Sequence, residues 1–385
     1  MRTIGVVSVG RSDYGLLRPV VRRIAIDPAL SLCLYVTGGH LLHGTVAEIE
    51  RDGVEIAERV EPERQDDSPE GVALTAASVT AGFARVFSRR APDILLVLGD
   101  RFEMHAAALA ALPFGLPVAH VHGGETSEGA IDESLRHGIT KLSHLHFASA
   151  VEHARRVVQL GEEPWRVTVT GAPGLDTLRE VEPLSRPELS ALLGIPLDDG
   201  PLLITYHSVT LQHDRTSEQV AELLAALELS DRPLVFTAPN ADTNGTVIRK
   251  KLEEFVQSRP RSVLVESLGA AAYAGMLSCA AAMVGNSSSG LIEAPSFELP
   301  VVNVGIRQRG RLRAPNVVDA DDGRTAIRDA LDRALDPAFR KSLAGLANPY
   351  GDGRAAERIV ARLLSVELGP ELTIKRFHDL DALAS

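Results

Sequence analysis

Three carboxylate side chains lie where apolar segments of the sequence end. Asp100 and Arg101 follow the apolar segment DILLVLG, Glu125 follows PVAHVHGG, and Asp132 opens a helical pattern that extends to residue 144. Carboxylates that are crowded together repel one another, and the repulsion raises at least one pKa toward the range useful in acid–base catalysis. The cluster therefore predicts a catalytic site that moves protons.

The helical pattern DESLRHGITKLSH adds cations to this cluster. Asp132 and Arg136 are four residues apart and share one helix face, while Glu133, His137 and Lys141 line the neighbouring face. Taken singly, Asp132 and Arg136 fit a solvated surface pair equally well. Their occurrence beside other polar residues at strand ends favours a functional role.

Histidines are concentrated between His105 and His153, and two of them alternate along one predicted strand. His120 and His122 would point to the same face, and such a pair with nearby carboxylates can chelate zinc or manganese. A third and fourth ligand at a spacing typical of zinc is missing, however. We therefore expect neither a metal nor another cofactor.

A second constellation, AAMVGNSSSGLIEAPSF, predicts an anion site. A strand ends at Asn286, and a helix begins near Ser287 and Ser288, where free backbone N–H groups and hydroxyls can bind a diphosphate. Glu293 could accept hydrogen bonds from both hydroxyls of a ribose. The same residues also fit an ordinary capped helix start. The segment has no lysine, so it is not a P-loop, and no G-x-G-x-x-G follows the first strand.

Further polar groups stand at predicted strand ends, where open α/β sheets bind their ligands. They are Arg11 and Asp13 after the first strand, His207 in the segment Tyr206 to Ser208, Asn240 with Asp242, and Arg307.

The elements that position these groups alternate between short apolar strands and longer helical patterns. TIGVVSVG, SLCLYVTGG, DILLVLGD, PVAHVHGG, HLHFASA and RVTVTGAP form one series, and PLLITYHS, PLVFTAPN, SVLVES, AAMVGNS and PVVNVG form a second. Continuously apolar strands are typical of parallel sheets that helices cover on both faces. With 385 residues, we expect an α/β protein of two Rossmann-like, doubly wound domains, 1–175 and 176–352, flanking a cleft.

The charge and composition of the chain argue against nucleic acid and membrane as its partners. The net charge is −11, and no Lys/Arg block suggests a grip on nucleic acid. No segment reaches the roughly 18 uninterrupted apolar residues of a membrane span, and the N-terminus is typical of a first strand, so we expect a cytoplasmic protein. Cys33 and Cys279 lie in apolar segments and are expected to be buried free thiols.

These motifs together resemble one family, the hydrolysing UDP-N-acetylglucosamine 2-epimerases of bacterial sialic acid biosynthesis. The resemblance covers nearly the whole chain, in order, through GRSDYGLL, GDRFE, HVHGGETSEGAIDESLRHGITKLSHLHF, NADTNG, GNSSSGLIEAPSF, GIRQRGR and NPYGDG. It implies a glycosyltransferase-B-like fold whose C-terminal helix, about 353–385, packs back on the first domain. It also implies a UDP-sugar substrate and a homodimer.

The reaction of this family is loss of UDP from UDP-N-acetylglucosamine with removal of the proton on sugar carbon 2, followed by addition of water to the glycal and release of N-acetylmannosamine. The resemblance implies that Asp100, Glu125 and Asp132 handle protons and that Arg136 and His207 support the diphosphate or the charge balance. The substrate-binding positions that match are Arg11, Asp13, Arg101, His207, Asn240, Asn286, Ser287, Ser288, Glu293 and Arg307.

Two details refine the resemblance. GDRFE favours the hydrolysing branch of the family, whereas the non-hydrolysing relatives have a GDT-type sequence. The family usually has proline after the histidine that corresponds to His207, and Ser208 stands there in this chain. A proline fixes the turn that aims the histidine, so its replacement puts the placement of His207 in question.

Alternatives remain open at the level of the sequence. The same chemistry could act on a UDP- or GDP-linked 2,4-diacetamido-trideoxy sugar of the legionaminic acid route. From other classes, the histidine-rich segment fits a metal-dependent hydrolase, and the strand-end residues fit a non-catalytic nucleotide-sugar binding protein.

Overall fold

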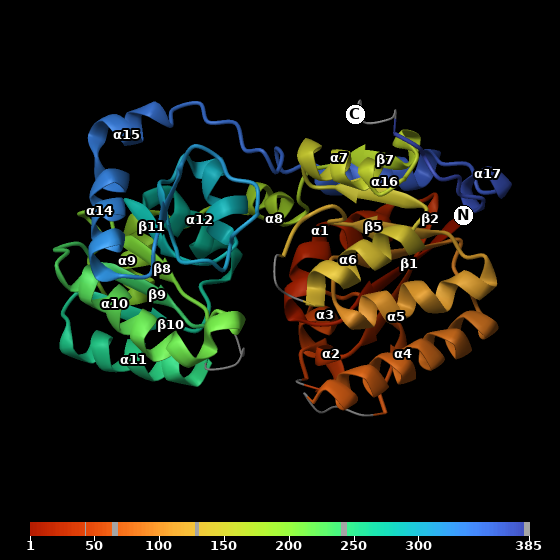
Figure 1. The fold of residues 1–385 in the computed structure, drawn as a ribbon, viewed down its shortest axis with the longest axis horizontal. Coiled ribbons are helices and arrows are strands. Elements are labelled where there is room, and N and C mark those ends of the chain that lie inside the picture. Colours follow the sequence, from red (N-terminus) through yellow and green to blue (C-terminus); the bar gives the residue numbers. More distant parts are fainter. Residues whose placement is uncertain (43, 64–67, 128–130, 240–244, 381–385) are drawn as a thin grey trace, which may run out of the picture. The chain divides into compact units, whose positions relative to one another are not determined.

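The computed structural model describes residues 1–42, 44–63, 68–127, 131–239 and 245–380. The chain divides into two compact units, one formed by 1–177 with 350–385 and the other by 178–349 (Figure 1). Each unit contains one sheet in which every pair of neighbouring strands is parallel.

The first unit has a seven-stranded sheet in the order β3-β2-β1-β4-β5-β6-β7. Its strands are β1 (Arg2–Ser8), β2 (Leu30–Thr37), β3 (Ile56–Val60), β4 (Ile94–Leu98), β5 (Val118–Val121), β6 (Leu145–Ala148) and β7 (Val167–Val169). Every residue of β4, β5 and β6 is buried. These strands are continuously apolar, apart from two histidines, because helices cover both faces of the sheet.

Most helices of this unit lie between successive strands, and two, α16 and α17, belong to the C-terminal segment. They are α1 (Arg11–Ile26), α2 (Gly39–Leu42), α3 (Val46–Arg51), α4 (Pro69–Arg89), α5 (Phe102–Ala111), α6 (Ile131–Leu142), α7 (Val151–Gln159), α16 (Ala355–Ser365) and α17 (Pro370–Thr373), while α8 (Gly174–Glu180) leads into the second unit. The strand order reverses between β1 and β4, so right-handed crossovers place α1 and α5 on opposite faces. Helix α16 packs against α1, and α5 packs between α4 and α6.

Helix α4 is long and apolar enough, by length and composition alone, to cross a membrane. One face of it is part of the core of the first unit, where Val79, Phe83, Val86 and Phe87 pack among buried apolar residues. Tyr35 of β2 meets the rings of Phe83 and Phe87 edge-on. These contacts place α4 in the helical layer of the α/β unit.

The second unit has a six-stranded sheet in the order β10-β9-β8-β11-β12-β13. Its strands are β8 (Leu202–Thr205), β9 (Leu234–Thr237), β10 (Ser262–Val265), β11 (Ala282–Gly285), β12 (Val301–Val304) and β13 (Val317–Ala320). Its helices are α9 (Arg186–Leu193), α10 (Thr216–Glu228), α11 (Gly245–Ser258), α12 (Gly269–Cys279), α13 (Ser289–Ile292), α14 (Arg324–Leu335) and α15 (Pro337–Ser342). Helix α10 contacts α11 and α14, and α9 contacts α12.

The α/β class with two doubly wound parallel sheets, expected from the sequence, is confirmed. In each sheet the strand order reverses once, between β1 and β4 and between β8 and β11. Ligands of open α/β sheets bind at the carboxyl ends of the strands beside such a reversal. The polar residues singled out in the sequence follow β1, β4, β5, β8, β11 and β12, which puts them at those ends.

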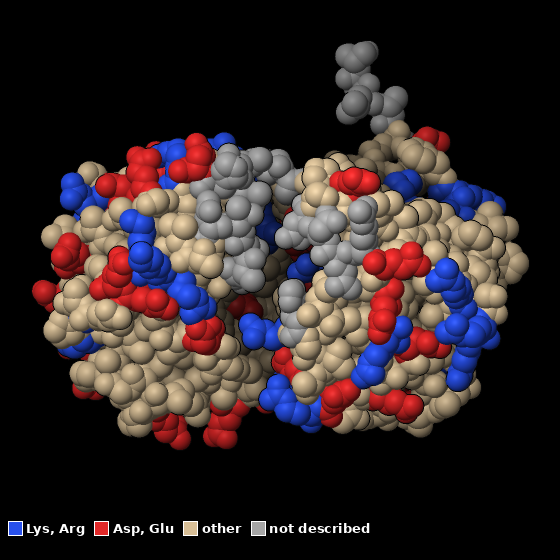
Figure 2. Space-filling model, turned by 90° about the horizontal axis from the view of Figure 1, so that it is seen from below, with Lys and Arg blue, Asp and Glu red and all other residues tan. Residues whose placement is uncertain are grey.

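Charge and cysteine usage can also be read from the structure. Acidic and basic side chains are interspersed over the face seen in Figure 2, where the coloured residues form no continuous basic field. Both cysteines are free thiols. Cys33 is buried as expected, whereas Cys279, the last residue of α12, is only partly buried, which corrects the expectation for it.

Candidate active site

Three neighbouring strands of the first unit end at one level and deliver the candidate catalytic groups. The backbone N–H of Gly99 donates to Val121 O at 2.9 Å, and that of His122 donates to Phe147 O at 3.1 Å. The residues just beyond β4, β5 and β6 therefore lie beside one another along the sheet edge. They include Asp100, His122 and Ser149.

Asp100 forms an ion pair with Arg136 of α6. The Arg136 side chain is 3% exposed, and its Nη2 also donates to Ser127 Oγ at 3.0 Å. Nε and Nη1 of Arg136 are buried and make no hydrogen bond to any of the described residues. A buried guanidinium with free donors is suited to an anionic ligand, because unfilled buried donors carry a desolvation cost that the ligand would remove.

Asp132 lies in the first turn of α6, one helical turn from Arg136. It is partly buried. Next to it, Glu133 accepts a hydrogen bond from the backbone N–H of Ser127 at 2.5 Å and lies 3.2 Å from His137 Nε2. The start of α6 thus holds the preceding loop at Ser127, which in turn contacts Arg136.

Glu125 is buried, and its carboxylate contacts the side chains of two neighbouring residues. Its Oε1 accepts a hydrogen bond from Ser149 Oγ at 2.6 Å and lies 2.5 Å from His122 Nδ1. Ser149 Oγ also lies 2.8 Å from His153 Nδ1. The carboxylate is therefore tied to β5 and β6 together, and His122, which the sequence suggested only as a metal ligand, lies beside it.

His120 and His122 do not act as the pair of strand ligands that the sequence suggested. His120 is on β5, where its ring contacts Gly99 O at 2.8 Å and Thr140 Oγ1 at 3.2 Å. Burial lowers the pKa of His120 to about 3. His122 lies beyond the strand with a φ of 66°, which turns its ring toward Glu125. Among the described residues no group of three His, Cys, Asp or Glu side chains could hold a metal ion.

Gly124 makes this turn possible. Its φ is 79°, and a Cβ atom there would lie 2.2 Å from His153 O. Only glycine fits such a close approach to α7 at a left-handed φ. The Gly-Gly of HVHGGE thereby allows the chain to double back and present Glu125 to His122.

A second acidic group stands at the start of α1. Asp13 is buried and lies 3.1 Å from Arg101 Nε, whose Nη2 donates to Ser12 Oγ at 3.3 Å. Burial raises the pKa of the Asp13 carboxyl, although Arg101 opposes the shift. Arg11 is exposed at the first position of the helix. Arg11 and Arg101 are thus cations at the carboxyl ends of β1 and β4.

In the second unit, Asn286 fixes the position of His207. Asn286 Oδ1 accepts the backbone N–H of His207 at 2.7 Å, and Nδ2 donates to His207 O at 2.8 Å. This clamp holds the turn that a proline holds in the family pattern. Asn286 therefore positions His207, and its amide keeps one acceptor and one donor beyond these two bonds.

Arg307 and Gln308 join the same cluster from the loop after β12. Arg307 Nη1 donates to Asn286 O at 3.2 Å, and Gln308 Nε2 donates to the same oxygen at 2.8 Å. Burial, with a smaller contribution from Arg307, lowers the pKa of His207 to about 4. His207 is therefore neutral near pH 7 and can offer one donor and one acceptor.

The predicted anion site is built differently from the expectation. Helix α13 is a single turn, Ser289–Ile292, so its dipole is weaker than that of a full helix. Ser287 and Ser288 precede it and are partly buried, and Ser287 Oγ accepts the backbone N–H of Ser289 at 3.3 Å. The serine hydroxyls and N–H groups therefore carry most of any affinity for an anion.

Glu293 directly follows α13 and receives a hydrogen bond from Ser289, whose hydroxyl also contacts Tyr273 Oη. Burial raises the pKa of Glu293. A partly buried carboxyl with a single hydroxyl donor retains acceptor capacity for further hydroxyl groups. Asn240, the remaining predicted residue, lies outside the described residues.

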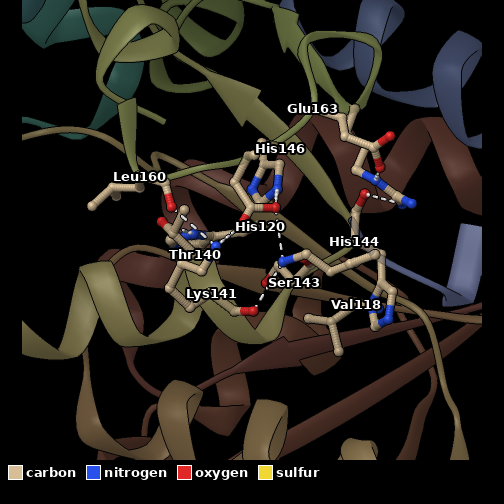
Figure 3. A network of polar contacts seen from close by, with 12 residues as sticks. Val118, His120, Thr140, Lys141, Ser143, His144, His146, Leu160 and Glu163 are labelled. Atoms are coloured by element: carbon tan, nitrogen blue, oxygen red, sulfur yellow. Dashed lines mark hydrogen bonds and ion pairs between the residues drawn. The ribbon is translucent and has the colours of Figure 1, made fainter. Parts of the chain in front are cut away.

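The first unit also contains a buried polar network, in which Lys141 and His146 are labelled in Figure 3. Glu162 is fully buried and receives Lys141 Nζ at 2.6 Å, Lys375 Nζ at 2.7 Å and His146 Nε2 at 3.0 Å. Burial alone would raise the pKa of Glu162, but these partners hold it at about 2. Arg166 adds hydrogen bonds to the carbonyls of Glu371, Leu372 and Ile374. The network fastens the C-terminal segment to the first unit.

The structure defines an α/β protein of two doubly wound units, with carboxylates at the strand ends of one sheet and partly buried serine hydroxyls at those of the other. The sequence matches the UDP-N-acetylglucosamine 2-epimerase family over residues 22–364. The chain belongs to this family. The fold also matches that of the lipopolysaccharide outer core galactosyltransferase WaaB, with a TM-score of 0.53 at 12% identity, covering 95% of this chain and 99% of the other, which confirms the glycosyltransferase-B-like fold.

Individual relatives cover the chain almost completely. It is 36% identical over 378 residues to the UDP-N,N'-diacetylbacillosamine 2-epimerase (hydrolyzing) of Legionella pneumophila, covering 97% of this chain and 99% of the relative. It is 36% identical over 345 residues to the GDP/UDP-N,N'-diacetylbacillosamine 2-epimerase (hydrolyzing) of Campylobacter jejuni, covering 88% and 87%. The crystal structure of UDP-GlcNAc 2-epimerase from Neisseria meningitidis bound to UDP-GlcNAc superposes with a TM-score of 0.80 at 19% identity, covering 95% and 100%.

Proposed function

We propose that this enzyme is a hydrolysing 2-epimerase whose donor is a UDP-linked 2,4-diacetamido-trideoxy sugar. The observation that carries the proposal is the 36% identity over 97% of the chain to a hydrolysing diacetylbacillosamine 2-epimerase. A second relative of the same identity is named for the same sugar. The sequence resemblance alone had favoured UDP-N-acetylglucosamine, and the relatives shift the choice to the alternative donor.

The proposed reaction begins with elimination. The proton on sugar carbon 2 is removed while the bond from carbon 1 to the diphosphate oxygen breaks, which gives a glycal and UDP. Water then adds to the glycal, and the 2-epimeric sugar is released. The hydrogen on carbon 2 is weakly acidic, so stabilisation of the departing diphosphate must supply much of the rate.

The residues described above fit these demands. Arg136 has two buried nitrogens without hydrogen bonds, and Arg11, Arg101 and Arg307 are further cations at strand ends. Preorganised donors of this kind stabilise charge that develops in the transition state. Asp100, Asp132 and the group formed by Glu125 supply the proton-transfer chemistry that the elimination and the hydration require.

UDP-N-acetylglucosamine is the second candidate donor. The family as a whole is described by this substrate, and the superposed crystal structure contains it. The two donors differ at sugar carbon 4, where an acetamido group replaces a hydroxyl, and at carbon 6, where a hydroxyl is missing. Polar groups that a site uses to bind a hydroxyl strongly reject an analogue without it.

The test is proton NMR of the purified protein with each donor in deuterated water. We expect release of UDP and of the 2-epimer of the diacetamido sugar, with deuterium at carbon 2, at a higher kcat/KM than with UDP-N-acetylglucosamine. Preference for UDP-N-acetylglucosamine would reverse the choice of donor. Loss of activity in excess chelator would favour a metal-dependent hydrolase, and binding of UDP without turnover would favour a binding protein.

Two further features belong to the proposal. The resemblance to the family supports a homodimer, which light scattering of the purified protein tests. It also supports a cytoplasmic location, which fractionation of the source cells tests.

A further inference from the structure

We propose that His122, held by Glu125, is the base that removes the proton from sugar carbon 2. This inference rests on the proposed elimination and assigns one of its steps to a residue that the sequence pattern suggested only as a metal ligand. It changes the part played by Glu125, which becomes a positioning residue that acts through His122.

The hydrogen bonds of the His122 imidazole leave Nε2 as its proton acceptor. His122 Nδ1 lies 2.5 Å from Glu125 Oε1, and a carboxylate accepts hydrogen bonds, so Nδ1 carries the proton in the neutral ring. The lone pair is then on Nε2. This nitrogen is buried and makes no hydrogen bond to any described residue. A buried acceptor without a partner is costly unless a ligand fills it.

The hydrogen bonds of the Glu125 carboxylate suit it to position His122. Its Oε1 already receives both the Ser149 hydroxyl and His122 Nδ1, and its side chain is 8% exposed. A carboxylate in this arrangement fixes the tautomer and the direction of an imidazole and stabilises its protonated form. It is poorly placed to reach a substrate carbon itself.

The backbone conformation and the location of His122 also support its role as the base. His122 adopts a φ of 66°, a backbone conformation that is uncommon for residues other than glycine and is typical of functional sites. It lies at the end of β5, the neighbour of β4, which delivers Asp100 with its partner Arg136. His122 Nε2 and the Arg136 nitrogens, which have no hydrogen-bond partner among the described residues, therefore lie near the carboxyl ends of adjacent strands. His122 Nε2 is suited to accept a proton, and Arg136 is suited to bind the leaving anion.

The elimination moves one proton and two electron pairs. Nε2 of neutral His122 takes the proton from carbon 2, the electrons of that C–H bond form the double bond to carbon 1, and the electrons of the carbon 1 to oxygen bond leave with UDP. In the hydration, water oxygen bonds to carbon 1 while a protonated carboxyl group gives carbon 2 a proton on the opposite face. That carboxyl recovers a proton from the adding water, and the imidazolium returns its proton to solvent.

His122→Asn is the primary test. Asparagine tolerates a positive φ, and its amide nitrogen can replace Nδ1 as the donor to Glu125, while Nε2 is lost. We expect UDP release from the donor to fall about a hundredfold or more, the usual range for a lost general base. Hydration of the separately supplied glycal, in the presence of UDP, should stay near the wild-type rate. UDP affinity should be unchanged, and His105→Asn on α5 is the matched control.

The outcomes separate the inference from the function on which it rests. An inactive wild type would refute the proposed function and the inference with it. With an active wild type, a His122→Asn enzyme that still releases UDP at the wild-type rate, or one in which elimination and hydration fall equally, overturns only the role of His122.

A second variant covers the case in which His122→Asn does not fold. His122→Gly has no backbone strain at this φ and leaves a space where free imidazole can enter. Added imidazole should restore UDP release in proportion to its concentration. A folded His122→Gly enzyme that imidazole does not rescue would overturn the proposal.

Discussion

Asn286 holds both backbone polar groups of His207 with its side-chain amide, at 2.7 Å and 2.8 Å. This one side chain joins the ends of β8 and β11. These two strands lie on either side of the strand-order reversal in the second unit. Both residues are buried, so water cannot replace the bonds. The arrangement makes the orientation of His207 depend on Asn286.

The first prediction follows from this clamp. Asn286→Ala leaves the buried N–H and C=O of His207 without partners, which costs about 1–3 kcal/mol for each group left unsatisfied. Asn286→Asp should be worse, because a carboxylate oxygen would then face His207 O. Calorimetric unfolding should show both losses in the transition of the second unit, with Ser287→Ala as the control. A stability equal to that of the wild type would contradict the clamp.

The second prediction concerns the carboxylates that touch the reacting sugar in the proposed mechanism. Asp100→Asn and Asp132→Asn should each lower kcat by about a hundredfold or more, as expected for lost acid–base groups. Folding of Asp132→Asn should be little affected, because Asp132 is only partly buried. Asp100→Asn removes the carboxylate that pairs with the buried Arg136 and should also lower stability. The measurement is UDP release under saturating donor, with the exposed Glu61→Gln as control. Variants within about threefold of wild type would remove these residues from the proton-transfer step.

The third prediction distinguishes positioning from chemistry at Glu125. Ser149 donates to Glu125 Oε1 at 2.6 Å, and Ser149→Ala removes one neutral hydrogen bond worth about 0.5–1.5 kcal/mol. We expect kcat to fall by roughly two- to tenfold while KM stays constant, because a loss of about 0.5–1.5 kcal/mol in transition-state stabilisation lowers the rate by that factor. A change confined to KM would mean that Ser149 serves substrate binding.

The fourth prediction addresses the buried network of Figure 3. Glu162→Gln leaves Lys141 and Lys375 without their carboxylate, and breaking a buried ion pair by removing one partner costs about 3–5 kcal/mol. Trp165, the single tryptophan, lies in the first unit and reports its unfolding by fluorescence. The exposed Glu55→Gln should unfold like the wild type. The variant should also release the C-terminal segment to proteases, and an unchanged urea midpoint would show that the network contributes nothing.

Much of the fold could be predicted from the sequence because interior strands of a parallel sheet are apolar on both faces. The predicted strands correspond to β1, β2, β4 to β7 and β8 to β12. The two that were missed, β3 and β13, are edge strands. Their segments, IAERV and VVDA, contain charged residues that remain partly or fully exposed, so they lack the signal on which the prediction depends.

The candidate site was only partly predictable for a different reason. Position at a strand end is local and could be inferred, whereas the partner of each side chain depends on contacts between distant segments. Arg136 was matched to Asp132 by helical spacing, but it forms an ion pair with Asp100, 36 residues away. His122 was interpreted as a strand residue paired with His120. Its signal was the Gly-Gly that follows, which indicates a sharp turn and a side chain aimed away from the strand.

The last prediction is a loss of stability in mild acid. Burial lowers the pKa of His40 to about 4, of His120 to about 3 and of His144 to about 4, from an ordinary value of 6.5. Folded-state pKa values below the unfolded value mean that unfolding takes up protons, so these residues stabilise the fold above pH 6.5 and the stability is lost as pH falls toward 4. Near pH 5 each histidine contributes a slope of nearly 1.4 kcal/mol per pH unit, about 4 for the three. Urea unfolding followed by Trp165 fluorescence between pH 5 and 7 measures the slope, and His144→Gln should reduce it by the share of one histidine, nearly 1.4 kcal/mol per pH unit near pH 5. A stability independent of pH over this range would show that these histidines bind protons equally in the folded and the unfolded protein.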